Sequence, residues 1–449
     1  MKTALRIAIF SVALIALVPR ATPAHVSGYL HFVQGEARDA GVATAATSSG
    51  KKVTAYTLAP DLYRKAHRLG QIAFWGQIVG FFYTVFVLLL ILRGRLASKF
   101  RDWAEGASSS RFVQVLVFAP SILLSIALLG IPLDIATEWV SKRFGLSIQS
   151  WTSWLWDWTK GELISIIIGS VLIWILYAVI RRSPRRWWFY FWLAALPLGV
   201  FLIFLQPLVI DPLFHKFEPL ASKDPALTAS LEHMVQRAGQ NIPPERMFWM
   251  GAGEKTTSLN AYVTGIGASK RVVVWDTTIR KMNTPQIVFV AGHEMGHYVL
   301  GHIWKGMIFG AVGLFVIFYL GSKIIGGMLA RSATQWGIRD LGDWASFPAL
   351  LLLLTVLAFI ANPIFSAFSR HDEHQADQYG LEVTHGLTPD SGQIAAQAFQ
   401  VLGEVDLSDP DPNPLGVFLF YSHPAIPDRI RFSLAYDPWA NGGAGEFVK

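Results

Sequence analysis

Six windows of about 20 mostly apolar residues constrain the fold of this chain more than any other feature. A helix rises about 1.5 Å per residue, so about 20 residues cross the hydrocarbon core of a bilayer. A water-soluble core does not explain six such windows, and 52% of the residues are hydrophobic whereas only 15% are charged. We therefore predict an α-helical polytopic membrane protein. The expected spans lie near residues 71–92, 112–131, 162–180, 187–209, 307–328 and 347–368.

A shorter apolar run near the N-terminus, residues 7–18, follows two basic residues and precedes a stretch of small residues. This order is typical of a signal peptide, and an uncleaved first helix would begin in the same way. The sequence leaves both interpretations open for residues 1–24. We expect residues 25–210 to form an N-terminal membrane domain and residues 211–449 to form a second domain that includes the last two spans.

His293 and His297 occur in the pattern His-Glu-Met-Gly-His within an apolar stretch of the chain. Successive helical residues are separated by about 100°, so four residues place the two imidazoles within about 40° on one face. Both rings can then bind one zinc ion, and Glu294 beside them is placed to take a proton from a zinc-bound water. The pattern predicts the zinc-binding helix of a metallopeptidase.

The surroundings of this pattern favour a metal site over a chance match. Thr284 and Pro285 are expected to supply the N-cap and the first-turn proline of the helix. Apart from the glutamate of the pattern, residues 286–304 carry no acidic or basic side chain other than histidine. A buried helix of this kind needs a metal or hydrogen-bond partners for its polar groups. His302 would lie about 180° from His293 on a continuous helix, so we expect a structural histidine there.

A catalytic zinc site needs a third protein ligand and one open position. Glu373 is the best candidate, because Glu373 and Asp377 are four residues apart and would share a helix face. Asp377 would then accept a hydrogen bond from a ligand imidazole and fix the orientation of that ring. His371 and His374 remain rival ligands, although two histidines and one glutamate suit a hydrolytic zinc site better. A solvated helix face with two acids would show the same spacing.

Residues 259–264 alternate in polarity and are followed by a glycine-containing turn and a second apolar run, residues 271–275. This pattern predicts a β-hairpin. The fold class is therefore a helical membrane protein whose second domain contains a small β-hairpin or sheet. The residues alone do not distinguish a structural hairpin from one that binds a ligand.

Several segments resemble, in the same order, the type 1 CAAX prenyl protease family of integral-membrane zinc metallopeptidases. Besides the two-histidine pattern, the matching segments are residues 211–220, 258–265 and 369–377, the tripeptide Ser422-His423-Pro424, and Arg429. The resemblance is specific from about residue 205 to 435, whereas the first 200 residues match mainly in their pattern of spans. It implies six or seven transmembrane helices around a chamber, the seventh helix being residues 7–18.

The resemblance also implies the roles of the site residues. One zinc ion would be bound by His293, His297 and Glu373, with Glu294 as the general base. His423 would stabilise the oxyanion of the reacting peptide, and Arg429 would brace that group or the substrate backbone. The strand with Asn260, Ala261 and Tyr262 would bind an extended substrate by edge pairing, which recognises backbone more than side chain.

Basic residues cluster after the first span and between the third and the fourth. Such clusters usually mark cytoplasmic loops. With both clusters inside, the segment with the zinc site lies on the extracytoplasmic side, which differs from the cytosolic site of the eukaryotic family members. The two clusters are Arg93, Arg95, Lys99 and Arg101, and Arg181, Arg182, Arg185 and Arg186.

The composition limits the partners of the chain. The absence of cysteine excludes disulfides and thiolate ligands. Much of the net charge of +7 lies in the two basic clusters, where anionic lipids account for it without nucleic acid. The expected partners are the lipid bilayer and a peptide or protein substrate that is prenylated or membrane-associated.

The leading interpretation is a membrane-integral zinc metalloendopeptidase. Its substrate would be a prenylated CAAX peptide or a damaged membrane-associated protein. One alternative is the membrane quality-control protease of the heat-stress type, which has fewer spans and lacks the segment 212–220. Another is a zinc-binding scaffold or chaperone, which would not need Glu294 as a base. Zinc is the preferred metal, although cobalt or manganese could replace it in vitro.

Overall fold

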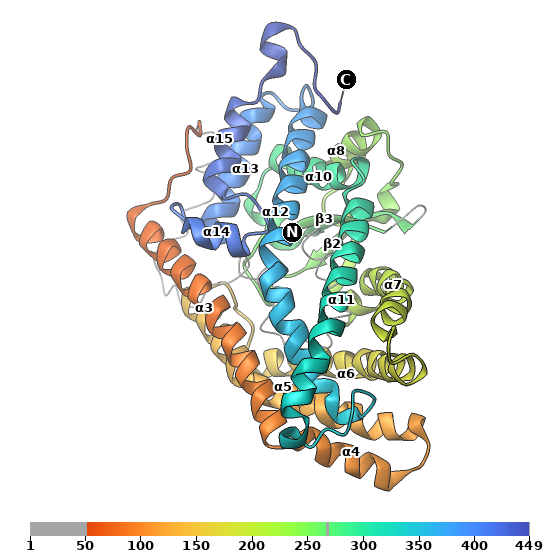
Figure 1. The fold of residues 1–449 in the computed structure, drawn as a ribbon. Helices are drawn as coiled ribbons and strands as arrows, with labels where there is room; N and C mark the ends of the chain where they lie inside the picture. Colours follow the sequence, from red (N-terminus) through yellow and green to blue (C-terminus); the bar gives the residue numbers. More distant parts are fainter. Residues whose placement is uncertain (1–51, 266–268, 449) are drawn as a thin grey trace.

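The computed structural model describes residues 52–265 and 269–448. The run at residues 7–18, and with it the choice between a signal peptide and a first helix, lies outside the described residues. The described chain is mostly helical and contains one small sheet (Figure 1).

Six described helices are long and apolar enough to cross a membrane, which confirms the six predicted spans. Most are longer than a bilayer core requires, because their polar ends continue as helix beyond the apolar window. Large apolar side chains such as Phe82, Ile308 and Ile360 are exposed on their outer faces, as lipid contact requires. The helices are α3 (Pro60–Arg93), α5 (Arg111–Phe144), α6 (Trp151–Arg182), α7 (Trp187–Leu205), α11 (His302–Trp336) and α12 (Phe347–Thr384).

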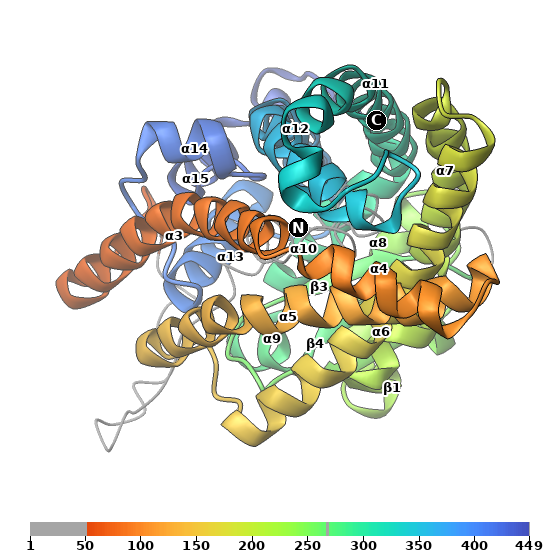
Figure 2. The same cartoon turned by 60° about the horizontal axis from the view of Figure 1, so that its bottom comes forward.

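A short helix, α4 (Leu96–Ala107), joins α3 to α5 at the lower end of the bundle in Figure 1. An ion pair and a hydrogen bond to the backbone hold this end together. Arg101 Nη1 lies 2.6 Å from Asp343 Oδ2, and Arg181 Nε donates to the carbonyl of Gly342 at 3.0 Å. The two basic clusters and the connection between α11 and α12 therefore meet at one end of the molecule (Figure 2).

The sheet has the strand order β1-β2-β4-β3, with β2 and β4 parallel and the other pairs antiparallel. The predicted hairpin is confirmed: Tyr262 of β3 is opposite Val273 of β4. The strand begins at Ala261, two residues later than predicted, because the backbone of Asn260 bonds to the Thr278 hydroxyl. The strands are β1 (Lys216–Pro219), β2 (Met247–Gly251), β3 (Ala261–Thr264) and β4 (Arg271–Trp275).

The upper half of the molecule in Figure 1 is built around α10 (Thr284–Val299), which contacts α12, α13, α8 and β3. Helix α12 passes from the membrane bundle into this half. Its first part is the apolar span, and its second part carries Glu373 and Asp377. The other helices here are α8 (Pro225–Arg237), α9 (Asp276–Lys281), α13 (Ser391–Val405), α14 (Pro414–Phe420) and α15 (Ile426–Ala435). The short helical segments are the π-helix η2 (Gln206–Ile210) and the 3₁₀ helices η3 (Asp211–Leu213), η4 (Leu220–Ser222), η5 (Pro244–Arg246), η7 (Trp344–Ser346) and η8 (Pro438–Asn441).

The upper end of α12 is bound to a segment near the C-terminus. The buried carboxylate of Glu382 accepts backbone hydrogen bonds from Glu446, Phe447 and Val448 at 3.0, 2.6 and 2.8 Å. Together with the side chains of Tyr436 and Gln378, three consecutive N–H groups thus satisfy a carboxylate that would be costly to bury alone.

Candidate active site

Helix α10 begins with a capping box. Asn283 Oδ1 accepts from the N–H of Gln286 at 3.0 Å, and Gln286 Oε1 accepts from the N–H of Asn283 at 3.0 Å. The prediction of Thr284 as the N-cap was wrong by one residue, because the asparagine carboxamide satisfies the exposed amides instead. Pro285 lies in the first turn as predicted, where its missing N–H costs nothing.

Glycines allow α10 and α12 to approach closely. A Cβ atom at Gly296 would lie 3.0 Å from Cβ of Tyr379, and one at Gly292 would lie 2.9 Å from Val383 Cγ1. In return, a Cβ at Gly380 of α12 would lie 3.1 Å from the backbone nitrogen of His293. The small residues at these positions bring the two-histidine pattern within reach of the acids of α12.

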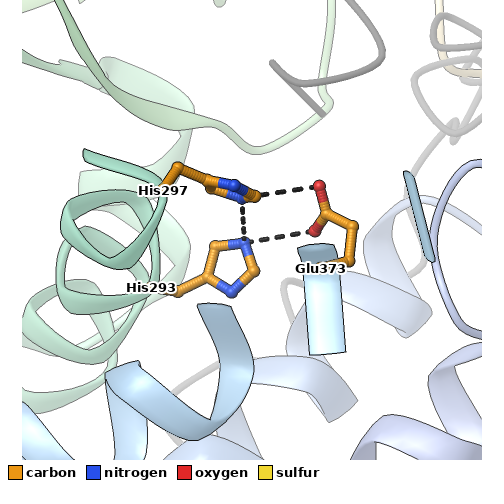
Figure 3. A group of neighbouring side chains, drawn as sticks. All are labelled: His293, His297 and Glu373. Atoms are coloured by element: carbon orange, nitrogen blue, oxygen red, sulfur yellow. Dashed lines mark hydrogen bonds and ion pairs between the residues drawn. The ribbon is translucent and has the colours of Figure 1, made fainter. Parts of the chain in front are cut away.

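The side chains of His293, His297 and Glu373 converge between the two helices (Figure 3). Nε2 of one histidine lies 3.2 Å from Nε2 of the other. Glu373 Oε2 lies 3.2 Å from His293 Nε2, and Oε1 lies 3.5 Å from His297 Nε2. All three residues are buried, and the glutamate has no exposed surface. The structure thus brings together the three residues expected to bind the metal.

His293 is oriented from behind by Asp377. Its Nδ1 lies 2.8 Å from Asp377 Oδ1, and the same carboxylate accepts two bonds from Arg429, at 2.8 Å from Nε and 2.5 Å from Nη2. A carboxylate only accepts hydrogen bonds, so Nδ1 carries a proton, and in the neutral ring Nε2 then presents its lone pair to the cluster.

His297 is oriented by a second chain of polar groups. Its Nδ1 lies 3.0 Å from Nδ1 of His302, whose Nε2 lies 3.0 Å from Gln375 Oε1. If the amide oxygen accepts from His302 Nε2–H, then His302 Nδ1 accepts from His297, and the lone pair of His297 Nε2 faces the cluster. The opposite amide orientation would put a proton on that nitrogen and exclude metal binding.

The prediction of a continuous helix through His302 was wrong. Helix α10 ends at Val299, and Gly301 adopts a left-handed conformation with φ 70° before α11 begins. The break turns His302 back toward His297 instead of away from it. His302 is a structural histidine as expected, but the side chain contacts a candidate ligand directly.

The donor set fits zinc. The two Nε2 atoms face each other at 3.2 Å, a contact that needs either a proton or a metal ion between their lone pairs. Ligand atoms about 2.0–2.1 Å from a tetrahedral zinc ion are separated by about 3.3 Å. The nitrogen–nitrogen and nitrogen–oxygen separations of 3.2, 3.2 and 3.5 Å agree with that arrangement.

The electrostatics also favour a cation. Burial opposes protonation of His293, but the carboxylates of Asp377 and Glu373 outweigh it and raise the pKa of the imidazole to about 9. The same carboxylates would attract a metal ion in place of that proton. Burial lowers the pKa of His297 well below its ordinary value, which favours the neutral ring that binds a metal.

Glu294 and His423 are two of the three predicted catalytic residues. Glu294 follows His293 on α10 and is 6% exposed. His423 Nε2 lies 3.3 Å from Glu373 Oε1, and its Nδ1 lies 2.9 Å from the hydroxyl of Ser422. Burial lowers the pKa of His423 well below its ordinary value, so the ring near the cluster is neutral and can donate one N–H.

Arg429 binds the carboxylate that contacts His293. Its guanidinium is buried and lies 4.2 Å from the ring centroid of Phe399. Both Nε and Nη2 donate hydrogen bonds to the carboxylate of Asp377. These contacts indicate that Arg429 positions Asp377 and His293, and its contact with substrate stays a prediction.

The predicted substrate-binding residues lie at the edge strand of the sheet. Tyr262 points its side chain into a small core with Met250 and Val273, and Ala261 packs into the core of the upper half. Asn260 lies just before β3. Any recognition by this strand therefore involves its backbone and not the tyrosine ring.

The rival ligands lie apart from the cluster. His371 and His374 are exposed, and the ring of His374 packs against Phe432. Sequence reasoning missed Gln375 and Ser422 as partners of site histidines. Both occur inside the motifs that carry the family resemblance, which is the only signal that could have pointed to them.

The fold and site together define a membrane-integral metallopeptidase. Residues 221–435 match the model of peptidase family M48, and residues 46–216 match that of the CAAX prenyl protease N-terminal region, described as five membrane helices. A Bacillus subtilis protein described as the uncharacterized metalloprotease YhfN is 36% identical to this chain. The match covers 77% of this chain and 79% of the Bacillus protein. The chain belongs to peptidase family M48.

Other relatives agree with this assignment. CAAX prenyl protease 1 of Saccharomyces cerevisiae is 27% identical over 72% of each chain. The crystal structure of S. mikatae Ste24p matches with a TM-score of 0.71 at 22% identity and covers 97% of this chain and 99% of that one. At this identity the structural likeness establishes the shared fold. The alternatives of a heat-stress protease and a non-enzymatic scaffold are not favoured.

Proposed function

We propose that this metalloendopeptidase uses one zinc ion, bound by His293, His297 and Glu373, to hydrolyse peptide bonds of membrane-associated substrates. The observation that carries the proposal is the convergence of two Nε2 atoms and one carboxylate at 3.2–3.5 Å beside the buried Glu294. A purely structural zinc site would have four protein ligands and no need for the adjacent acid.

Zinc, when bound, would polarise the peptide carbonyl and lower the pKa of a water molecule to about 7. Glu294 is the general base of this proposal: it takes a proton from the attacking water and passes it to the leaving amine. Because the acid is buried, the proton is exchanged out of contact with bulk solvent.

His423 acts as the electrophilic helper. Its neutral ring donates from Nε2 toward the developing oxyanion, while the Ser422 hydroxyl donates to Nδ1 and fixes the ring. Asp377 and Arg429 hold His293, and Gln375 holds His302 and through it His297. These four residues position the site without touching the substrate.

The substrate chain lies extended along β3 and pairs with its backbone. The relatives named CAAX prenyl protease 1 supply the substrate class for the first test, a prenylated C-terminal CAAX peptide. Recognition through backbone explains how such a site accepts different side chains around the cleaved bond.

The zinc site is proposed to face the extracytoplasmic side. Arg101 and Arg181 bind the same α11–α12 connection at the lower end of the bundle, opposite the cluster of α10 and α12 in Figure 1. Positive residues gathered at one end support a cytoplasmic position for that end. Because the chain has no cysteine, a single engineered cysteine shows on which side of the membrane its position lies. Labelling of a cysteine at Arg185 from outside would overturn the extracytoplasmic position of the zinc site.

This sidedness favours a second substrate class, damaged or misfolded proteins on the outer face of the membrane. The two classes make different demands. A prenylated peptide presents a lipid chain and a free C-terminus, whereas a damaged protein presents an extended internal segment. Cleavage of an internal, unprenylated segment would favour the second class.

The deciding experiment uses detergent-purified protein and a farnesylated CAAX peptide, with an unprenylated copy of the same peptide beside it. Cleavage by the wild type, lost in Glu294→Gln and after chelation and restored by zinc, would support the mechanism. Stoichiometric zinc without cleavage of either peptide would contradict the endopeptidase activity on this class.

A further inference from the structure

Polar side chains of α12 bind the C-terminal end of α14. The last carbonyl groups of a helix have no donor within the helix and need another partner. Arg370 Nη1 donates to the carbonyl of Val417 at 2.9 Å and to that of Tyr421 at 2.6 Å. Asn362 Nδ2 donates to the carbonyl of Leu419 at 2.5 Å. Two side chains of α12 therefore satisfy three carbonyl groups in and just after α14.

These hydrogen bonds set the position of α14, which lies between α3 and α12 (Figure 1). The ring centroid of Phe420 is 6.0 Å from that of Phe74 on α3 and 6.1 Å from that of Phe359 on α12. Ring pairs remain in contact over a range of about 4.5–7 Å, whereas a hydrogen bond holds its donor and acceptor to within a few tenths of an ångström. The bonds from α12 therefore fix α14 more closely than the ring contacts do.

The segment after α14 carries His423, two residues beyond the Tyr421 carbonyl that Arg370 binds. On the other side of this histidine, Arg429 binds the carboxylate of Asp377 at 2.8 and 2.5 Å. The segment is thus attached to α12 both before and after His423.

The attachment at Arg370 lies close to the metal cluster along α12. Arg370 and Glu373 are three residues apart and therefore lie on neighbouring parts of one helix face. Oε1 of Glu373 is 3.3 Å from Nε2 of His423. One helix thus holds both the carboxylate and the turn that brings the imidazole to it.

His423 borders a cavity. Together with Tyr421 and Ser422, it lines a space of about 570 Å³. A group beside open space has fewer close neighbours to fix it than a group in a packed core. A catalytic donor must nevertheless be held to within about 0.5 Å of its working position. The bonds to the backbone on either side of His423 supply that precision.

We propose that Arg370 is a positioning residue for the reaction: its bonds to the carbonyl groups of Val417 and Tyr421 set the distance of His423 Nε2 from the reacting carbonyl of the substrate. The inference rests on the proposed role of His423 as the electrophilic helper. Because Arg370 contacts backbone and not substrate, its loss lowers the rate of the reaction and leaves the binding of zinc and peptide in place.

The test compares Arg370→Met with Arg370→Lys in detergent-purified, zinc-loaded protein. Methionine keeps an apolar stem without a donor, whereas both bonds come from one nitrogen, which a lysine ammonium can replace. We expect kcat to fall about 10–100-fold in Arg370→Met, because displacement of a catalytic group by about 1 Å has an effect of that size. KM and zinc content should stay near the wild-type values, and Arg370→Lys should recover most of the rate.

A matched control is Arg95→Met. Arg95 also donates to two carbonyl groups at the end of a helix, those of Thr334 and Gln335 of α11, but at the end of the bundle opposite the metal cluster. Loss of these bonds should leave kcat at the wild-type value, even if it lowers the melting temperature as Arg370→Met does. An equal fall of kcat in both variants would show a general loss of structure and overturn the inference.

Coupling to His423 separates the inference from the proposed function. In a His423→Ala background, Arg370→Met should cause no further loss of kcat, because the group that it positions is absent. Additive losses, or a wild-type kcat in Arg370→Met, would overturn the inference alone. A wild-type kcat in His423→Ala would contradict the proposed role of His423 and, with it, the inference.

Hydrogen–deuterium exchange gives a readout that needs no substrate. The amides of residues 417–425 should exchange faster in Arg370→Met than in the wild type or Arg95→Met, and Arg370→Lys should restore most of the protection. Unchanged exchange of this segment in Arg370→Met would overturn the inference. Faster exchange, together with a wild type that cleaves no peptide, would contradict the peptidase function and support the attachment of the His423 segment by Arg370.

Discussion

His302 Nδ1 lies 3.0 Å from His297 Nδ1 across the helix break at Gly301. Removing the partner of a metal-binding histidine typically weakens metal affinity about 10–100-fold. We expect that loss for His302→Ala, measured by zinc competition with a chromogenic chelator. His371→Ala, an exposed histidine of α12, is the control and should keep the wild-type affinity. Unchanged zinc affinity in His302→Ala would contradict the orienting role.

Glu294→Gln should abolish proton transfer while it preserves the volume of the side chain. We expect kcat to fall about 10²–10⁴-fold with zinc content unchanged, because a general base contributes about that factor. Zinc content is measured by mass spectrometry, and kcat for peptide cleavage is measured on the same sample. A variant that retains near-normal kcat would exclude Glu294 as the base.

Gly296→Ala should push α10 away from α12, because its Cβ would lie 3.0 Å from Cβ of Tyr379. Overpacking of this kind costs about 1–3 kcal/mol and would separate the ligands. We expect a lower melting temperature and weaker zinc binding. Gly326→Ala on α11 adds the same methyl group where, among the described residues and apart from its own helix backbone, no heavy atom lies within 4 Å, so it should lower neither quantity.

Arg429→Lys tests whether this residue positions Asp377 or contacts substrate. Lysine keeps the charge but loses the paired donors that bind the carboxylate. We expect weaker zinc binding, with kcat and KM near the wild-type values once excess zinc restores occupancy. A raised KM at full occupancy would instead place Arg429 against the substrate.

Burial raises the pKa of Asp406 well above its ordinary value. The folded protein therefore holds a proton that the unfolded chain releases above about pH 4. The stability that protonated Asp406 contributes is fully present below that pH. It is lost as the pH rises through the pKa of Asp406 in the folded protein. Asp406→Asn should raise the melting temperature of detergent-purified protein at pH 8 and change it little at about pH 4. An equal change in melting temperature at both pH values would contradict the raised pKa of Asp406.

The six spans and the hairpin could be predicted because each depends on local sequence. About 20 apolar residues must span a bilayer, and alternation around a glycine turn specifies a two-stranded pairing. The grouping of His293 with His297 followed from helical spacing. Their approach to Glu373, about 80 residues later in the chain, was expected only from the chemistry of zinc and the family resemblance.

The features that were missed depend on three-dimensional contacts. The break at Gly301 could not be distinguished from continued helix, because isolated glycines also occur inside helices. The turn of His302 toward Gln375, and the binding of Arg429 to Asp377, join segments that have no fixed spacing in the sequence. The loop after α13 likewise meets α3 only in the folded chain, where Asp409 Oδ1 lies 3.1 Å from Nδ1 of His67.

The three backbone amides that bind Glu382 have a practical consequence for anyone who expresses this protein. The helix that bears Glu382 also bears Glu373, so a deletion or fusion that displaces residues 446–448 would remove three of the donors to a buried carboxylate of the metal-binding helix and leave it the side chains of Tyr436 and Gln378. Affinity handles are therefore better attached through a spacer that leaves these amides in place. A low zinc content in a protein altered at residues 446–448 would then be explained by the handle before a defect of the active site is considered.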